Sequence, residues 1–193
     1  MALLCCALLA ATSGPALGQA VVRVECRLSF VFDASGLAGI RESWRFDPRF
    51  SAEVLREYDR DRDARFSPAE TAAIKSGALD NLAKSGYFNA VRINGVPYPV
   101  HEVTEFTARC EAGVLVYEFF VPCPVPAAEA PRQVEVAVYD RDFYADVSLA
   151  EDGVRVENAA GFAAEVSVDF AEDLVFFGGA VAPEVATLTF GRR

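Results

Sequence analysis

The residues with the clearest chemical potential lie in one short segment in which acids alternate with other side chains. Counted from Asp59, its oxygen-bearing side chains stand at positions 1, 3, 5, 9 and 12, and these are Asp59, Asp61, Asp63, Ser67 and Glu70. This is the ligand spacing of an EF-hand calcium loop, in which position 7, here Arg65, contributes its backbone carbonyl and the final glutamate contributes both oxygens. The segment therefore predicts a Ca²⁺ site held by Asp59, Asp61, Asp63, Arg65, Ser67 and Glu70.

Ala64, at position 6 of this loop, predicts that the site is weak. An EF-hand loop normally has glycine there, because the chain must make a sharp turn. A left-handed backbone costs a residue with a side chain about 1 to 2 kcal/mol. We expect a dissociation constant on the order of 10⁻⁴ to 10⁻³ M, as in extracellular modules, and a structural role rather than a switch.

The same residues have explanations that need no metal. Ser67 and Glu70 also have the spacing of a capping box at the start of a helix. The three aspartates could instead pair with Arg60, Arg62 and Arg65 on a solvated turn. Three crowded carboxylates repel one another without a cation, and the arginines relieve only part of that cost.

A second segment, Tyr139 to Tyr144, crowds aromatic residues and acids directly after a predicted strand. It predicts either a turn whose rings pack on the core, or a further ligand site formed by Tyr139, Asp140 and Asp142. The single histidine, His101, has no serine or cysteine nucleophile motif to act with. We therefore expect that the protein is not an enzyme.

Hydrophobic periodicity places the acidic loop between two helices. Asp47 is the expected N-cap and Pro48 the first residue of a helix that ends at Tyr58, and a second helix runs from Ser67-Pro68 to Gly86. Alternating apolar residues predict strands at 22–32, 37–46, 91–93, 103–110, 114–121, 134–139, 147–156, 164–170 and 186–190. The fold class that follows is α+β, mainly β: an antiparallel β sandwich or two packed sheets, with a helix-loop-helix inserted at about residues 47–86.

The proline-rich and alanine-rich stretch Pro122 to Pro131 is the best candidate for a linker. It would separate an N-terminal β unit at residues 21–125 from a C-terminal β unit at residues 131–193. The two units are either separate or parts of one continuous domain.

The N-terminus has the pattern of a secretory signal peptide at residues 1–20. An apolar run from Ala2 to Ala11 is followed by Gly14-Pro15 and by small residues at Ala16 and Gly18. The alternative is an uncleaved anchor helix, but the run is shorter than the roughly 20 residues that span a bilayer. We expect a periplasmic or secreted protein without a membrane span in the mature chain.

The charge and the cysteines fit this location. The chain has 28 acidic against 18 basic residues and a net charge of -10, so nucleic acid is excluded as a partner and cations are favoured. Removal of the signal leaves Cys26, Cys110 and Cys123. The predicted hairpin of 103–110 and 114–121 holds Cys110 and Cys123 about 30 Å apart, which argues against a bridge between them. A bridge from Cys26 to either one, or three buried thiols, remains open.

The order of four motifs in the chain resembles a known family. The motifs are Phe46-Asp47-Pro48-Arg49-Phe50-Ser51, the acidic loop, Gly86-Tyr87-Phe88 and Val138-Tyr139-Asp140. Together they are similar to the bacterial periplasmic family catalogued as domain of unknown function one-thousand-and-seven, over nearly all of the mature chain. Its members are often described as periplasmic components of ABC-type transport systems and occur beside nickel or cobalt transporters. The resemblance implies an accessory role in metal uptake or homeostasis, with a membrane metal transporter as a partner.

The chain departs from that family at the start of the mature sequence. Members usually begin with His-Pro-His, whereas this chain has Gln19-Ala20-Val21-Val22-Arg23. Nickel or cobalt would lack its best ligands here, and the hard oxygen ligands that suit calcium remain. The expected function is therefore a non-catalytic, exported calcium-binding accessory protein. The alternative is a secreted structural or adhesive β module whose EF-hand loop is vestigial.

Overall fold

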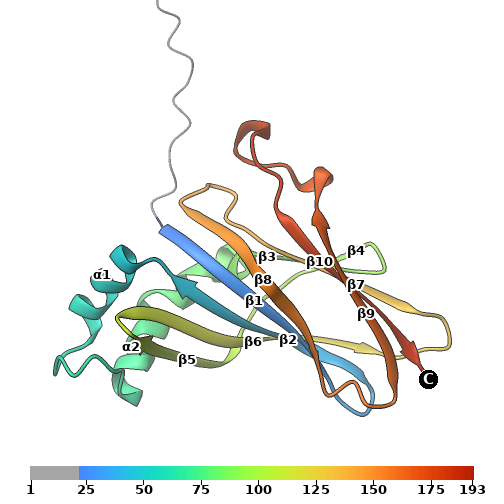
Figure 1. The fold of residues 1–193 in the computed structure, drawn as a ribbon, viewed down its shortest axis with the longest axis horizontal. Coiled ribbons are helices and arrows are strands. Elements are labelled where there is room, and N and C mark those ends of the chain that lie inside the picture. The colour runs from blue at the N-terminus through green and yellow to red at the C-terminus, as the bar shows by residue number, and fades with distance from the viewer. Residues whose placement is uncertain (1–21) are drawn as a thin grey trace, which may run out of the picture.

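Two five-stranded sheets packed face to face form the protein, with a pair of helices at one end (Figure 1). The computed structural model describes residues 22–193, so the predicted signal peptide at residues 1–20 lies outside the described residues. The mainly β fold with packed sheets and an inserted helical pair is confirmed. Within residues 22–193, no helix is long and apolar enough to cross a membrane.

The strands cover most of the described chain. They are β1 (Val22–Phe32), β2 (Gly36–Phe46), β3 (Asn89–Ile93), β4 (Val96–Tyr98), β5 (Thr104–Glu111), β6 (Val114–Pro126), β7 (Arg132–Val138), β8 (Ala145–Glu157), β9 (Phe162–Phe170) and β10 (Glu184–Arg192). The first sheet has the order β5-β6-β2-β1-β8 and the second the order β4-β3-β7-β10-β9. Strands from both sides of the Pro122 to Pro131 stretch therefore occur in each sheet. All neighbouring strands are antiparallel except β1 and β8, which are parallel.

The helices follow the opening hairpin. They are α1 (Pro48–Tyr58), α2 (Pro68–Gly77) and three 3₁₀ segments, η1 (Leu79–Phe88), η2 (Glu172–Leu174) and η3 (Phe177–Gly179). Asp47 caps α1 as predicted, because its carboxylate accepts from the backbone N–H groups of Arg49 and Phe50 at 2.9 and 3.0 Å. Ser51 ties the helix to the first sheet: it is fully buried, and its hydroxyl accepts a 2.9 Å bond from Leu115 N.

The second α-helix is shorter than the sequence predicts. It ends at Gly77 rather than at Gly86, and η1 follows it. At Gly77 a Cβ would lie 2.4 Å from the hydroxyl of Tyr58, so a larger residue would require the Tyr58 side chain of α1 to move. Leu79 falls within the longer helix that the sequence predicts. In the structure it is the first residue of η1, and its side chain is buried in the core.

The predicted hairpin of β5 and β6 is confirmed, with Glu111 paired to Val114 across a turn at Ala112 and Gly113. The linker prediction is partly wrong, because β6 continues to Pro126 and pairs with β2 up to Gly36. The pairing of β5 with β6 extends no further than Phe120, so the remainder of β6 has one open edge. Proline lacks an N–H and is tolerated at such an edge, which lets a proline-rich segment form a strand.

The space between the sheets is filled by a single apolar cluster with Trp44 near its centre. The Trp44 ring stacks on Phe88 at 5.9 Å and meets Phe119 edge-on at 5.0 Å. These contacts join the first sheet to the end of η1. The same cluster includes Val54 of α1, Ile74 of α2 and Val134 of the second sheet, so the helical pair and the two sheets share one core.

Candidate metal centre

The acidic loop lies between the end of α1 at Tyr58 and the start of α2 at Pro68, at the outer end of the helical pair (Figure 1). The structure brings three of the predicted ligands together. One carboxylate oxygen from each of Asp59, Asp61 and Asp63 lies within 4.8 Å of the others. Oxygens at this spacing can share one cation, since Ca²⁺ binds oxygen at about 2.3 to 2.6 Å.

The backbone of the loop turns as an EF-hand spacing requires at position 6. Ala64 has φ of 60°, the left-handed conformation that usually needs glycine. Its N–H donates to Oδ2 of Asp59 at 3.0 Å, and Asp63 N donates to Oδ1 of the same carboxylate at 3.2 Å. Arg65 N in turn donates to Oδ1 of Asp63 at 2.8 Å. Asp59 thus holds the loop closed while the chain wraps around the acids.

Glu70 has a different role in the structure from the one the ligand spacing predicts. Its Oε1 accepts from Arg60 N at 2.7 Å, and its Oε2 accepts from both the N–H and the hydroxyl of Ser67 at 2.8 Å. Glu70 N donates to the Ser67 hydroxyl at 3.3 Å, which completes a capping box. These N–H donors lower the pKa of Glu70. The capping box accounts for Ser67 and Glu70 without an ion.

Space for an ion nevertheless remains beside Glu70. A depression of about 220 Å³ is lined by Asp61, Ser67 and Glu70 together with Arg60 and Ala69. Three of the predicted ligands therefore face one hollow, although Glu70 would have to exchange hydrogen bonds for metal contacts.

The electrostatics of the loop favour a cation. Desolvation raises the pKa of Asp61, and the neighbouring charges of Asp63 and Glu70 raise it further. Of the arginines within the loop, Arg60 relieves part of this repulsion, because its charge helps to lower the pKa of Glu70. Among residues 22–193, neither Arg60, Arg62 nor Arg65 forms an ion pair with a carboxylate. A bound cation would stabilise the ionised form of all three aspartates.

The second predicted segment folds as a capped turn. Asp140 is 7% exposed, and its carboxylate accepts from the backbone N–H groups of Asp142, Tyr144 and Ala145, each at 3.0 Å. Tyr139 is buried and its ring lies 4.8 Å from that of Phe176. The contacts of Tyr139 and Asp140 thus fit the turn, the first of the two interpretations of this segment.

Asp142 remains exposed beside this turn. It lines an open depression of about 520 Å³ with His101 and Lys84. In that depression Asp142 is the acid left free for a ligand, because Asp140 is occupied by backbone donors.

Comparison with known families places this chain in one of them. The family described as "Protein of unknown function (DUF1007)" matches residues 4–171. The chain belongs to this family. The matched region contains the acidic loop, both α-helices and strands β1 to β9. No curated protein matches the chain.

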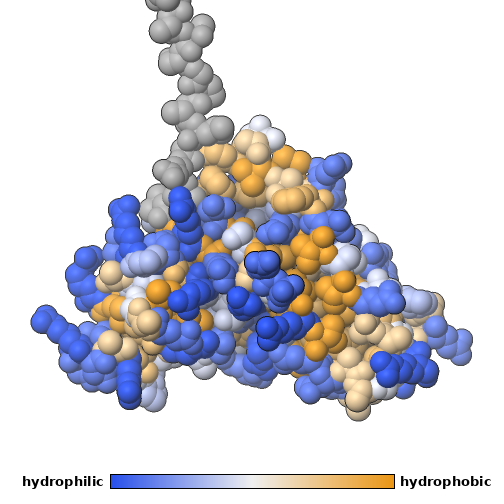
Figure 2. All heavy atoms as spheres, in the orientation of Figure 1, coloured by the Kyte–Doolittle hydropathy of each residue, from blue (hydrophilic) through white to orange (hydrophobic). Residues whose placement is uncertain are grey.

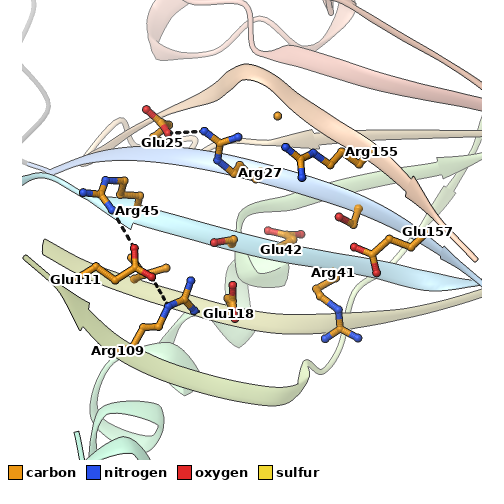
Figure 3. Close-up of a pocket in the computed structure, with 14 residues that line it drawn as sticks. Glu25, Arg27, Arg41, Glu42, Arg45, Arg109, Glu111, Glu118, Arg155 and Glu157 are labelled. Atoms are coloured by element: carbon orange, nitrogen blue, oxygen red, sulfur yellow. Dashed lines mark hydrogen bonds and ion pairs between the residues drawn. The ribbon is translucent and has the colours of Figure 1, made fainter. Parts of the chain in front are cut away.

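A charged surface on the outer face of the first sheet is the other feature that could hold a ligand (Figure 3). Its side chains instead satisfy one another across the strands. Arg109 contacts Glu111 at 2.6 Å and Glu118 at 2.7 Å, and Arg45 reaches Glu111 at 3.3 Å. Such half-exposed pairs contribute about 0 to 1 kcal/mol each and keep the face solvated. We assign no binding role to this charged surface.

The sequence interpretation missed one buried acid, Glu42. It is fully buried, whereas Arg41 and Ser43 on either side of it are partly exposed. Strand alternation could have revealed it, since Glu42 occupies a core-facing position between Ile40 and Trp44. Burial raises the pKa of Glu42 from 4.5 to about 7, although the hydrogen bond from Trp44 opposes the shift.

Proposed function

We propose that this protein is a non-catalytic, exported calcium-binding accessory protein whose acidic loop holds one Ca²⁺ ion. The observation that carries the proposal is the convergence of Asp59, Asp61 and Asp63, whose carboxylate oxygens lie within 4.8 Å of one another. A left-handed turn at Ala64 already exists in the loop, so a cation would find a largely formed site.

The chemistry of the donor set favours calcium over other metals. All candidate ligands are oxygens, which suit hard cations. Mg²⁺ demands a nearly ideal octahedral shell at about 2.0 to 2.1 Å, whereas Ca²⁺ accepts six to eight irregular oxygens. Both carboxylate oxygens of Asp59 already accept hydrogen bonds from backbone N–H groups. A contact between Asp59 and the ion would therefore be made in addition to these hydrogen bonds. Weak binding, with calcium stiffening the α1–α2 pair, is the behaviour that we propose.

The cellular role that we propose is that of a periplasmic component of a metal transport or homeostasis system. Its support is the sequence: the signal pattern at residues 1–20, the net charge of -10 and the resemblance of the motif order to periplasmic proteins of transport systems. A membrane metal transporter is the partner that this role requires.

A specific observation favours a second candidate, a secreted structural or adhesive β module with a vestigial loop. Both oxygens of Glu70 already accept hydrogen bonds from Arg60 and Ser67. In this alternative the loop is an ordinary connection that Glu70 holds between two helices, and the aspartates close it without an ion.

Calcium titration of the mature chain separates the two candidates. Isothermal calorimetry and thermal melting at 0 to about 10 mM CaCl₂ cover the expected affinity range. We expect one site and a melting temperature that rises with calcium, because stabilisation grows as RT ln(1 + [L]/Kd). Asp61→Asn should abolish both effects, since Asp61 faces the hollow and makes one long bond of 3.4 Å to Asp63 N.

Glu151→Gln is the matched control, because it removes the same charge from an exposed position on β8. It should retain the calcium response of the wild type. No heat and no thermal shift in the wild type would reject the calcium proposal and leave the vestigial loop as the better account. An equal response to MgCl₂ would indicate general screening of the acidic chain rather than a calcium site.

A further inference from the structure

An apolar surface crowns one end of the sandwich, away from the acidic loop (Figures 1 and 2). Two connections build it, the turn between β7 and β8 and the segment between β9 and β10. We define the apolar tip by the residues Phe143, Tyr144, Leu174, Val175, Phe176 and Phe177. Tyr144 is 59% exposed and Val175 46% exposed, and the other four are partly exposed.

The apolar tip is a built feature, because aromatic contacts join its two connections. The ring of Phe143 lies 4.9 Å from Phe177 and 6.1 Å from Phe176, and Phe176 in turn packs on the buried Tyr139 at 4.8 Å. Asp140 holds the first connection by accepting from Tyr144 N at 3.0 Å. The exposed rings are thus held in place on a rigid base, where each exposed apolar side chain costs hydration free energy unless something covers it.

The path of the chain indicates what covers the tip. Val22, the first described residue, donates its N–H to Tyr144 O at 3.1 Å, so residues 1–21 join the fold at the tip itself. The apolar run Ala2 to Ala11 lies in that segment. Ten residues separate Ala11 from Val22, and they span at most about 35 Å. Whenever the apolar run occupies a bilayer, during export or afterwards, the tip is held next to that bilayer.

The chemistry of the tip suits a bilayer surface. Its six residues are uncharged. The ring of Tyr144 suits the headgroup level of a membrane, where its apolar body and its polar hydroxyl are both satisfied, and the three phenylalanines suit the apolar boundary just below it. Two acids, Glu172 and Asp173, precede Leu174 in the chain. The charge of Asp173 is balanced by an ion pair with Arg92 at 2.5 Å. The net charge of -10 opposes anionic lipids, so a zwitterionic surface is the better match.

We propose that the apolar tip is a membrane-docking surface that rests on zwitterionic lipid headgroups. Membrane docking does not depend on calcium binding, because the acidic loop lies elsewhere in the molecule (Figure 1). The two proposals have in common only that the protein is exported. Most of the segment between β9 and β10 also lies beyond residues 4–171, the part matched by the family. The docking surface is therefore a property of this chain rather than one taken from the family.

Flotation with phosphatidylcholine vesicles tests the proposal on the mature chain, without the apolar run that would itself bind lipid. This chain retains all strands and the whole core of residues 22–193. The test variant is Tyr144→Ser with Val175→Ser, which removes the most exposed tip residue from each connection. It leaves the packed rings of Tyr139, Phe143, Phe176 and Phe177 in place. We expect the wild type to float with the vesicles and the double variant to bind about tenfold or more weakly, with an unchanged melting temperature.

Val96→Ser is the matched control, since Val96 is 66% exposed at the start of β4, outside the tip. It should float as the wild type does. A wild type that stays with the soluble fraction overturns the proposal, as does a loss of binding in Val96→Ser equal to that of the double variant. Concentration-dependent dimers that form without lipid and disappear in the double variant would also overturn it and identify the tip as an interface between two copies. Calcium binding can fail or succeed independently of each of these results.

Discussion

The indole Nε1–H of Trp44 donates a 2.7 Å hydrogen bond to Oε2 of Glu42, two residues earlier on the same strand. Both side chains face the core, where Glu42 is 0% exposed and Trp44 is 2% exposed. The second oxygen of Glu42 and Oδ1 of Asn89 are buried acceptors without a partner among the described residues. A proton on Glu42 would supply a donor in a region that has too few, which agrees with the raised pKa of about 7.

We predict that Glu42 makes the protein less stable as the pH rises from about 4.5 to 7. In this range the folded state keeps the proton on Glu42 while the unfolded state has released it, so raising the pH favours unfolding. The shift of this pKa corresponds to about 3 kcal/mol of stability lost by pH 8. Glu42→Gln should remove the slope and melt several degrees above the wild type at pH 8.

Denaturant unfolding of both proteins at pH 5 and pH 8 measures this difference. The carboxyls whose pKa is lowered, such as Asp47 and Glu111, affect stability in the opposite direction and at lower pH, so they contribute little above pH 5. Glu151→Gln, on an exposed site, should keep the slope of the wild type. Identical slopes for wild type and Glu42→Gln would mean that Glu42 is ionised in the folded protein.

Strand periodicity was sufficient to predict most of the fold. The opening hairpin, the β5–β6 hairpin and the start of α1 follow from alternation and from the capping residues Asp47 and Pro48. The parallel pairing of β1 with β8 could not be predicted, because these strands are far apart in the sequence and no local signal sets their order. The early end of α2 lies at Gly77, where the Tyr58 side chain of α1 approaches, and a tertiary contact of this kind cannot be read from the sequence.

The cysteines should all remain thiols. Cys110 pairs with Leu115, which is eight residues or about 27 Å along β6 from Cys123. Cys26 is opposite Trp44, and two strands separate it from β5, so neither partner comes within the roughly 7 Å that a disulfide allows. The two bridges to Cys26 that the sequence left open thus do not fit the strand order.

We predict that, of the three cysteines in residues 22–193, one thiol reacts with a disulfide reagent in the folded protein and the other two react only after unfolding. Cys110 is partly exposed, whereas Cys26 and Cys123 are fully buried. Burial raises the pKa of Cys123 to about 12 and that of Cys26 above its ordinary value, so neither forms the reactive thiolate. Cys110→Ser should abolish the native reaction. A crosslinked peptide in non-reducing mapping would contradict the strand register.

The acidic loop shows where sequence reasoning about a site reaches its limit. Spacing alone placed Asp59, Asp61 and Asp63 together, and it required a left-handed residue at Ala64, which the structure has. Spacing could not decide between a metal ligand and a capping box at Glu70, because both need a carboxylate three residues after Ser67. That choice depends on which hydrogen bonds form, and in this structure the backbone supplies them.

We predict that Glu70→Gln lowers the melting temperature with and without calcium. The Glu70 carboxylate accepts from Arg60 N, Ser67 N and the Ser67 hydroxyl, and an amide can replace only one of its two oxygens as acceptor. If the loop is vestigial, Glu70→Gln should lower the melting temperature by the same amount with and without calcium. If calcium binds, the loss should be larger in calcium, because the variant also forfeits the stabilisation by the ion. An unchanged melting temperature without calcium would contradict the capping box.

Ala64→Gly should have a larger effect on the stability of the fold than on the affinity for calcium. Ala64 has φ of 60°, and hydrogen bonds from Asp63 N and Ala64 N to the Asp59 carboxylate hold this turn within the protein itself, so its strain is a cost of folding rather than of binding. Glycine removes that strain but adds freedom to the unfolded chain, and the balance is about 1 kcal/mol, or about 2 to 4 °C in melting temperature. A substitution changes calcium affinity only if it affects the calcium-free and calcium-bound forms of the protein differently. Because the turn at residue 64 is the same in both forms, the affinity for calcium should improve by about threefold or less.

Ala112→Gly is the control that isolates the calcium effect. Ala112 has φ of 50° in the β5–β6 turn, so the same substitution relieves a similar strain outside the acidic loop. Both variants should melt above the wild type without metal, and calorimetry should show a change in calcium affinity for Ala64→Gly alone. A tightening of a hundredfold by Ala64→Gly would mean that the loop adopts its left-handed turn only when calcium binds.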